Sequence, residues 1–228
     1  MAKMSTKIVL GSRSPRRREL LRLIVPEDRI LILPPRNSDE PGFEGRQTWD
    51  ELENRVKEIA RTKCRDVLEQ LHQGDAIRPQ ETGAVITADT VIVATDPNGR
   101  PVVLGQPEPA GDHSWQDVVR RWFQDYYAGR SHAALTALCV AVPSGRQVQR
   151  LARSDVTFRA DIDQWLDWYL QTGEPLGKAG GYGIQGAADL FVARVEGSIS
   201  NVVGLPLREL LETLEELGLD VGPPSLSG

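Results

Sequence analysis

Hydrophobic positions along the chain follow two spacings, which together predict a mixed α/β protein. Continuous apolar runs rich in β-branched residues, above all Ala84 to Ala94, are typical of strands buried on both faces. Apolar residues at helical spacing, such as Leu52, Val56 and Ile59, are typical of amphipathic helices. The pattern predicts strands at 8–10, 31–33, 84–94, 101–104, 133–142, 148–158 and 190–195, and helices at 15–24, 49–71, 114–127, 162–170 and 206–217.

The first predicted helix begins with a charge pattern that a helix does not favour. Ser14 can cap its N-terminus and Pro15 suits the first helical position, but Arg16, Arg17 and Arg18 follow in the first turn. Because the N-terminal end of a helix is partially positive, each cation there costs a few tenths to about 1 kcal/mol. A bound anion would reverse that cost, and phosphate is the natural candidate. An exposed basic turn without a ligand is the alternative.

Length and charge limit the classes of function. The 228 residues, of which 40% are hydrophobic, are enough for one substantial core. The formal net charge of −5 argues against a general nucleic-acid binder, so the local basic cluster suits a small anionic ligand. No apolar run is long enough to span a bilayer. Cys64 and Cys139 form no disulfide framework and no secretory leader is recognised, so we expect a cytoplasmic protein.

Acidic residues supply the next candidates. Asp89 interrupts the most apolar predicted strand, where a carboxylate without a partner would be costly to bury. Beside a phosphate site it could bind Mg²⁺ or act as a general base, whereas a cap at the end of a strand is an equal alternative. Asp39 and Glu40, in a predicted loop, offer oxygen ligands to a divalent ion, although a solvated acidic loop also explains them. Lys63, near the end of the second predicted helix, could contact a phosphate or simply be solvated.

A glycine-rich segment at 179–186 would let the backbone approach a ligand closely. It lacks the dinucleotide-binding and P-loop patterns, so neither of those interpretations applies. The amide of Gln185 could read the edge of a nucleobase, and a purely structural turn is the alternative. The segment 198–205 is predicted to be a loop packed beside the same site.

Taken in order, these segments resemble the Maf family of nucleoside triphosphate pyrophosphatases. Each match is short, but together they extend over nearly the whole chain. The matching stretches are LGSRSPRRRELL (10–21), IARTK (59–63), ITADTV (86–91), GRSH (129–132) with Thr136, DVTFR (155–159), GEPL (173–176), KAGGYGIQG (178–186) and GSISNVVGLP (197–206).

The resemblance implies a fold, a reaction and partners. The fold would be a single mixed α/β domain over residues 1–228, similar to inosine triphosphate pyrophosphatases, with an elongated bent sheet, two lobes, a central cleft and flexible tails at about 1–6 and 219–228. The reaction would be hydrolysis of a nucleoside triphosphate between the α and β phosphates, in a house-cleaning role. A divalent metal, Mg²⁺ or Mn²⁺, and a homodimer are also implied. The Ile-Gln-Gly form of 184–186 resembles the branch that acts on dTTP and UTP.

The resemblance also assigns roles to individual residues. It implies that Ser12, Arg16 and Arg17 hold the triphosphate, that Glu40 and Lys63 belong to the metal and phosphate shell, that Asp89 is the proton acceptor and a metal ligand, and that Thr90 and Gln185 help to select the base.

Two positions depart from the family pattern. Gln106 stands where the family has a lysine, which removes a charge and could weaken phosphate binding by about a kcal/mol or more. Gly177 stands where the family has an aspartate. These departures motivate a second hypothesis, a catalytically weak nucleotide-binding regulator of cell division or stress. DNA binding through residues 14–24 conflicts with the acidic balance of the chain.

Overall fold

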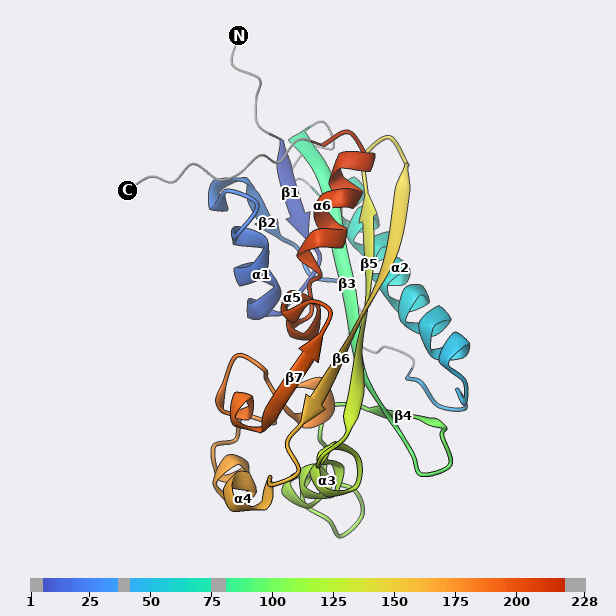
Figure 1. Ribbon diagram of the computed structural model, residues 1–228. Coiled ribbons are helices and arrows are strands. Elements are labelled where there is room, and N and C mark those ends of the chain that lie inside the picture. The colour runs from blue at the N-terminus through green and yellow to red at the C-terminus, as the bar shows by residue number, and fades with distance from the viewer. Residues whose placement is uncertain (1–5, 37–41, 75–80, 220–228) are drawn as a thin grey trace, which may run out of the picture.

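A mixed seven-stranded sheet forms the centre of the molecule (Figure 1). The computed structural model describes residues 6–36, 42–74 and 81–219. The sheet has the order β2-β1-β3-β5-β6-β7, with β4 paired to β3; β1 runs parallel to β2 and β3, and the other pairs are antiparallel. The strands are β1 (Lys7–Leu10), β2 (Ile30–Ile32), β3 (Thr82–Thr95), β4 (Pro101–Leu104), β5 (Ser131–Ala141), β6 (Gln147–Phe158) and β7 (Val192–Glu196). The predicted mixed α/β class is confirmed.

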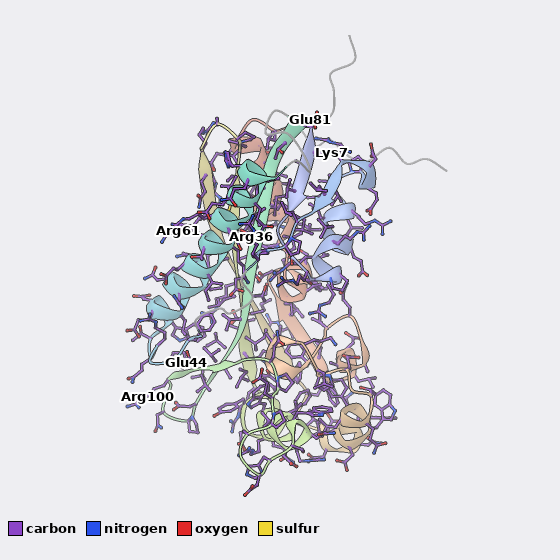
Figure 2. The ribbon with its side chains drawn as sticks, turned by 180° about the vertical axis from the view of Figure 1, so that it is seen from behind. Lys7, Arg36, Glu44, Arg61, Glu81 and Arg100 are labelled. Carbon is purple, nitrogen blue, oxygen red and sulfur yellow. The ribbon has the colours of Figure 1, made fainter. Side chains whose placement is uncertain are left out.

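Helices cover both faces of this sheet. The 25-residue α2 lies across one face, and the view from behind in Figure 2 shows it in front of the sheet with Arg61 on its solvent side. On the opposite face lie α1, α5 and α6, and α3 and α4 lie together near one end of the molecule (Figure 1). The helices are α1 (Pro15–Arg22), α2 (Trp49–Gln73), α3 (Trp115–Trp122), α4 (Asp163–Gln171), α5 (Ile199–Val203) and α6 (Leu207–Glu216).

The side chains of β3 alternate between two hydrophobic cores, which explains why the sequence of this strand is a continuous apolar run. Val85, Val91 and Val93 belong to the core beneath α2, whereas Ala84 and Ile86 belong to the core beneath α1 and α6. Because successive side chains of a strand point to opposite faces, a strand covered on both sides must be apolar at nearly every position. The prediction of a central strand buried on both faces is confirmed.

A third core, rich in aromatic rings, fills the end of the molecule that carries α3 and α4. Phe123 contacts Tyr127, Phe158 and Phe191 with ring centroids 5.2–5.5 Å apart. These edge-to-face and tilted contacts are favourable aromatic geometries. Tyr182, which belongs to the glycine-rich segment, buries its ring in this core. The core therefore supports that segment.

Two local predictions were wrong. The strand expected at 190–195 begins only at Val192, because Leu190 and Phe191 end a 3₁₀ turn (Ala187–Phe191) that buries the Phe191 ring. The loop expected at 198–205 contains the short helix α5, whose five residues are too few to show a helical period. The prediction of a helix at 114–127 is confirmed, with α3 continuing as a π-helical turn, Phe123–Tyr127. Among the described residues, none of the helices has the length and apolar composition to cross a membrane.

Candidate active site

A cavity of about 720 Å³ lies where the first turn of α1, the middle of β3 and the glycine-rich segment meet. It brings together residues from distant parts of the chain, from Arg13 to Val203. Of the predicted site residues, Arg16, Arg17, Lys63, Asp89, Thr90 and Gln185 line it. Ser12 is buried outside the lining, and Glu40, like Asp39 and most of the two predicted tails, lies outside the described residues.

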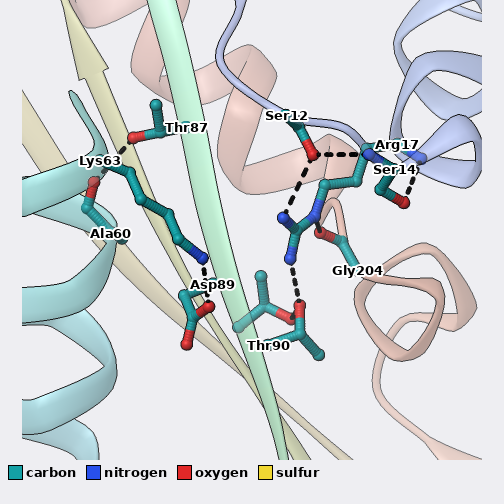
Figure 3. A network of polar contacts seen from close by, with 10 residues as sticks. Ser12, Ser14, Arg17, Ala60, Lys63, Thr87, Asp89, Thr90 and Gly204 are labelled. Atoms are coloured by element: carbon teal, nitrogen blue, oxygen red, sulfur yellow. Dashed lines mark hydrogen bonds and ion pairs between the residues drawn. The ribbon is translucent and has the colours of Figure 1, made fainter. Parts of the chain in front are cut away.

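Arg17 is held in place by three parts of the chain (Figure 3). Its Nε donates to the carbonyl oxygen of Gly204 at 2.8 Å, and its Nη2 donates to Thr90 Oγ1 at 3.1 Å. Its Nη1 donates to Ser12 Oγ at 3.4 Å. Ser14 caps α1 as predicted, accepting from the Arg17 backbone N–H at 3.4 Å. The geometry therefore gives Ser12 and Thr90 contacts that orient the guanidinium of Arg17.

A buried chain of hydrogen bonds continues from Thr90 to α5. Thr136 Oγ1 donates to the carbonyl oxygen of Asn201 at 3.1 Å, which uses its one hydroxyl proton. The 3.0 Å contact between the two threonine hydroxyls is therefore donated by Thr90, which in turn accepts from Arg17. The Asn201 side-chain amide donates to Ala134 O and Ser154 Oγ, each at 3.0 Å. Thr136 and Asn201 thus help to position Arg17 indirectly, through the hydroxyl of Thr90.

Neither Thr136 nor Asn201 was a candidate from the residue pattern, although each carried a signal. Thr136 is a polar residue between apolar neighbours on both sides in β5, and Asn201 is an amide followed by two valines; both are completely buried. Since buried polar groups need partners, such positions indicate a hydrogen-bond network. The partners themselves lie 65 residues apart and were not predictable locally.

Lys63 and Asp89 form an ion pair inside the cavity (Figure 3). Lys63 Nζ donates to Asp89 Oδ1 at 2.7 Å, and only 14% and 11% of the two side chains are exposed. Thr87 Oγ1 donates to Ala60 O at 2.8 Å and so ties β3 to α2 close to the pair. Asp89 lies in the middle of β3, opposite Ala137 of β5, so the alternative that it caps the end of a strand is wrong.

The three arginines at the start of α1 separate into two groups. Arg16 and Arg17 line the cavity. Arg18 instead forms a surface ion pair with Glu27, which Arg22 also contacts at 2.6 Å. The hydrogen bond from Arg18 holds the pKa of Glu27 below its ordinary value. Only two of the three cations therefore face a possible ligand.

The glycine-rich segment is folded tightly against β3 and β4. Gly180 N donates to Gly105 O at 2.9 Å, and Gly180 has a φ of +72°. A Cβ atom at Gly180 would lie 2.7 Å from Tyr127 Oη and 2.9 Å from Ile92 Cβ, so a side chain does not fit. Gln185, which is exposed, lines the cavity from this segment.

Two further side chains hold the same segment. The Glu174 carboxylate accepts from Ala187 N at 2.6 Å and from Tyr169 Oη at 3.3 Å. Tyr182 Oη lies 2.8 Å from Nε2 of His132, which is 3% exposed. Burial lowers the pKa of His132 to about 3, so its ring is neutral near pH 7. The segment thus forms a wall of the cavity that several side chains hold in place.

Fold and cavity together define a class: a mixed α/β protein whose cavity is lined by arginines, lysines and the carboxylates of Asp89 and Glu174. Residues 7–217 match the family model described as Maf-like protein, and the chain belongs to this family. The resemblance found in the sequence is confirmed.

Named relatives and solved structures are similar to this chain. A dTTP/UTP pyrophosphatase of Anaeromyxobacter dehalogenans is 38% identical over 218 residues, which cover 94% of this chain and 96% of the relative. One of Thermococcus gammatolerans is 36% identical over 215 residues, covering 94% and 98%. Among solved structures, a nucleoside-triphosphatase / dITP/XTP pyrophosphatase from Mycobacterium abscessus aligns with a TM-score of 0.41 and 17% identity, over 68% of this chain and 75% of the other.

Proposed function

We propose that this protein hydrolyses nucleoside triphosphates between the α and β phosphates, releasing a nucleoside monophosphate and pyrophosphate, with dTTP and UTP as preferred substrates. The observation that carries the proposal is the Asp89–Lys63 pair in a cavity that Arg16 and Arg17 also line. Relatives that match over nearly their full length are named dTTP/UTP pyrophosphatase, which supports the choice of substrate.

The proposed chemistry needs a base and cations in the same cavity. Asp89 accepts a proton from a water molecule, whose oxygen forms a bond to the α-phosphorus while the bond from that phosphorus to the bridging oxygen breaks. Pyrophosphate leaves with the bridging oxygen. Lys63 restrains the Asp89 carboxylate through its 2.7 Å hydrogen bond. Arg16 and Arg17 bind the phosphates, since guanidinium groups match phosphate geometry.

A divalent ion, Mg²⁺ or Mn²⁺, belongs to this proposal. Among the described residues no cluster of three or more His, Cys, Asp or Glu side chains could hold an ion alone. A metal that arrives with a nucleotide needs only one or two protein carboxylates, because phosphate and water oxygens complete its shell. Asp89, which lines the cavity, fits that requirement. Glu40, outside the described residues, is its predicted companion. When bound, the ion neutralises charge that develops on the departing pyrophosphate.

Selection of the base is assigned to Gln185 and Thr90, as the family resemblance implies. The amide of Gln185 has both donors and an acceptor for a base edge and lines the cavity. The hydroxyl of Thr90 bonds Arg17 and Thr136, so its influence on the substrate would pass through the position of Arg17. Both roles remain predictions.

The nucleotide-binding regulator is the second candidate. It is favoured by Gln106, which lines the cavity at the position where the family has a lysine. Pure protein incubated with each common triphosphate and Mg²⁺ or Mn²⁺ distinguishes the two candidates. We expect pyrophosphate release, fastest from dTTP and UTP. Release of no pyrophosphate above background would favour the regulator, and release of orthophosphate would indicate a phosphatase.

Two other expectations stay predictions. We expect a homodimer, which light scattering of the full chain would test. We also expect the protein in the cytoplasm, where its two cysteines, both present as thiols, would stay reduced.

A further inference from the structure

Among the described residues, five cationic side chains line the cavity, and four of them donate to an oxygen atom of the protein. Lys63 pairs with Asp89. Arg17 donates to Gly204, Thr90 and Ser12. Arg13 Nη2 donates to the carbonyl oxygen of Pro35 at 3.0 Å. Lys178 donates to a main-chain carbonyl, as Arg13 does, and Arg16 is the fifth cation. Lys178 and Arg16 come from distant parts of the chain.

Backbone and stem contacts hold Lys178 at the wall of the cavity. Its ammonium group donates to the main-chain carbonyl of Glu174, not to a carboxylate. A Cβ atom at Gly183 would lie 2.9 Å from Lys178 Cε, so the absence of a side chain there leaves room for the lysine stem. The loop thus places Lys178 without neutralising its charge.

Arg16 and Lys178 lie close enough to influence one another. Burial and then the charge of Arg16 lower the pKa of Lys178, while Glu174 opposes the shift. The Glu174 carboxylate also accepts from Ala187 N and Tyr169 Oη, and its charge offsets that of Lys178 only in part, since the pKa of Lys178 is still lowered. Two like charges beside one cavity repel each other, and an anion bound between them reverses the sign of that interaction.

Gln106 lies beside this pair of cations. The Gly180–Gly105 hydrogen bond joins the loop of Lys178 to the residue that precedes Gln106, and Gln106 lines the same cavity. Its neutral amide adds no third positive charge. The positive charge available at this wall therefore comes from Lys178.

We propose that Lys178, together with Arg16, binds the polyphosphate group of the nucleotide and supplies the cationic contact that Gln106 does not provide. This inference rests on the proposed function, because it takes the ligand to be a nucleoside triphosphate.

The test compares Lys178→Met, which keeps an unbranched stem and removes the charge, with Lys178→Arg, which keeps the charge. Lys57→Met on the outer groove of α2 is the matched control. Titration of each full-length protein with inorganic pyrophosphate and Mg²⁺ measures binding without hydrolysis, and steady-state assays with dTTP give KM and kcat. Urea unfolding reports stability.

We expect Lys178→Met to weaken pyrophosphate binding and raise KM by about 10- to 100-fold, as for the loss of a charged hydrogen bond. Lys178→Arg and Lys57→Met should stay close to the unaltered protein. Gln106→Lys added to Lys178→Met should restore part of the affinity, because both positions face one ligand group.

Equal pyrophosphate affinity in the unaltered protein and in Lys178→Met would overturn the inference, as would no measurable pyrophosphate binding to either. If Lys178→Arg were as impaired as Lys178→Met and both were destabilised, Lys178 would be a structural residue. Failure of the proposed function looks different: the unaltered protein would then release pyrophosphate from no triphosphate, whatever the titrations show.

Discussion

The Lys63–Asp89 pair offers a sharp test of the site, because stability and turnover should respond together. At 2.7 Å, the attraction of two unit charges is about 6 kcal/mol at an effective dielectric constant of about 20, and about 1.5 kcal/mol in water. Exposed fractions of 14% and 11% place the pair between these limits. Removing one partner of a fully buried pair costs about 3–5 kcal/mol, so we expect about 2–3 kcal/mol here.

A double-mutant cycle separates the pair from its surroundings. Asp89→Asn leaves the Lys63 ammonium beside a neutral amide, Lys63→Met leaves the carboxylate without its donor, and the double variant removes both charges. Urea unfolding without divalent ions should give a coupling energy of about 1–3 kcal/mol. The same cycle on Arg150 and Glu216, an ion pair with about half of each side chain exposed, should give less than about 1 kcal/mol.

Turnover supplies the second readout. A positioned general base contributes about 100- to 10,000-fold, so Asp89→Asn should lower kcat by that factor while the unfolding transition remains cooperative. Additive stability effects, within about 0.5 kcal/mol, would refute the ion pair. Undiminished kcat in Asp89→Asn would refute the role of Asp89 as the base, even if the coupling energy were as large as expected.

Three other predictions concern the walls of the cavity. Gly180→Ala should destabilise by more than about 2 kcal/mol in urea, from a positive φ and a 2.7 Å clash, whereas Gly99→Ala, with a φ of +81° and open space, should cost only about 1 kcal/mol. Since the folded pKa of His132 is depressed, its contribution to stability is present above about pH 6.5 and is lost as pH falls toward 3. The advantage of the unaltered protein over His132→Gln should therefore shrink by about 2 kcal/mol from pH 7 to pH 5, and an unchanged difference would contradict a buried neutral ring. Asn201→Ala, which loses two hydrogen bonds that hold α5, should raise KM for dTTP more than it lowers kcat, and an unaltered KM would argue that α5 does not position Arg17.

Local patterns were sufficient for most of the fold. The long apolar run of β3, the helical spacing of α2 and the cap at Ser14 each depend on residues that are close together in the chain. They could therefore be predicted from the sequence alone. The short helix α5 and the turn that ends at Phe191 could not, because segments of five residues carry no period and depend on what they pack against.

Part of the candidate site, too, could be predicted from the sequence, and part could not. The chain alone marked Arg16, Arg17 and Asp89 as unusual, because each places a charge where its local structure disfavours one. Which charge meets which partner depended on packing. Lys63 lies 26 residues from Asp89 in the chain, and Gly204 accepts a hydrogen bond from an arginine 187 residues away.

The physical reason is that neighbouring residues in the sequence determine whether a charged side chain lies in an unfavourable position. Which group compensates that charge depends on which residues the folded chain brings close to it. A sequence shows that a carboxylate in a strand or an arginine at a helix start needs a partner. Only the folded chain shows that Asp89 pairs with Lys63, that Arg17 donates to three oxygen atoms, and that Arg16 and Lys178 line the same cavity.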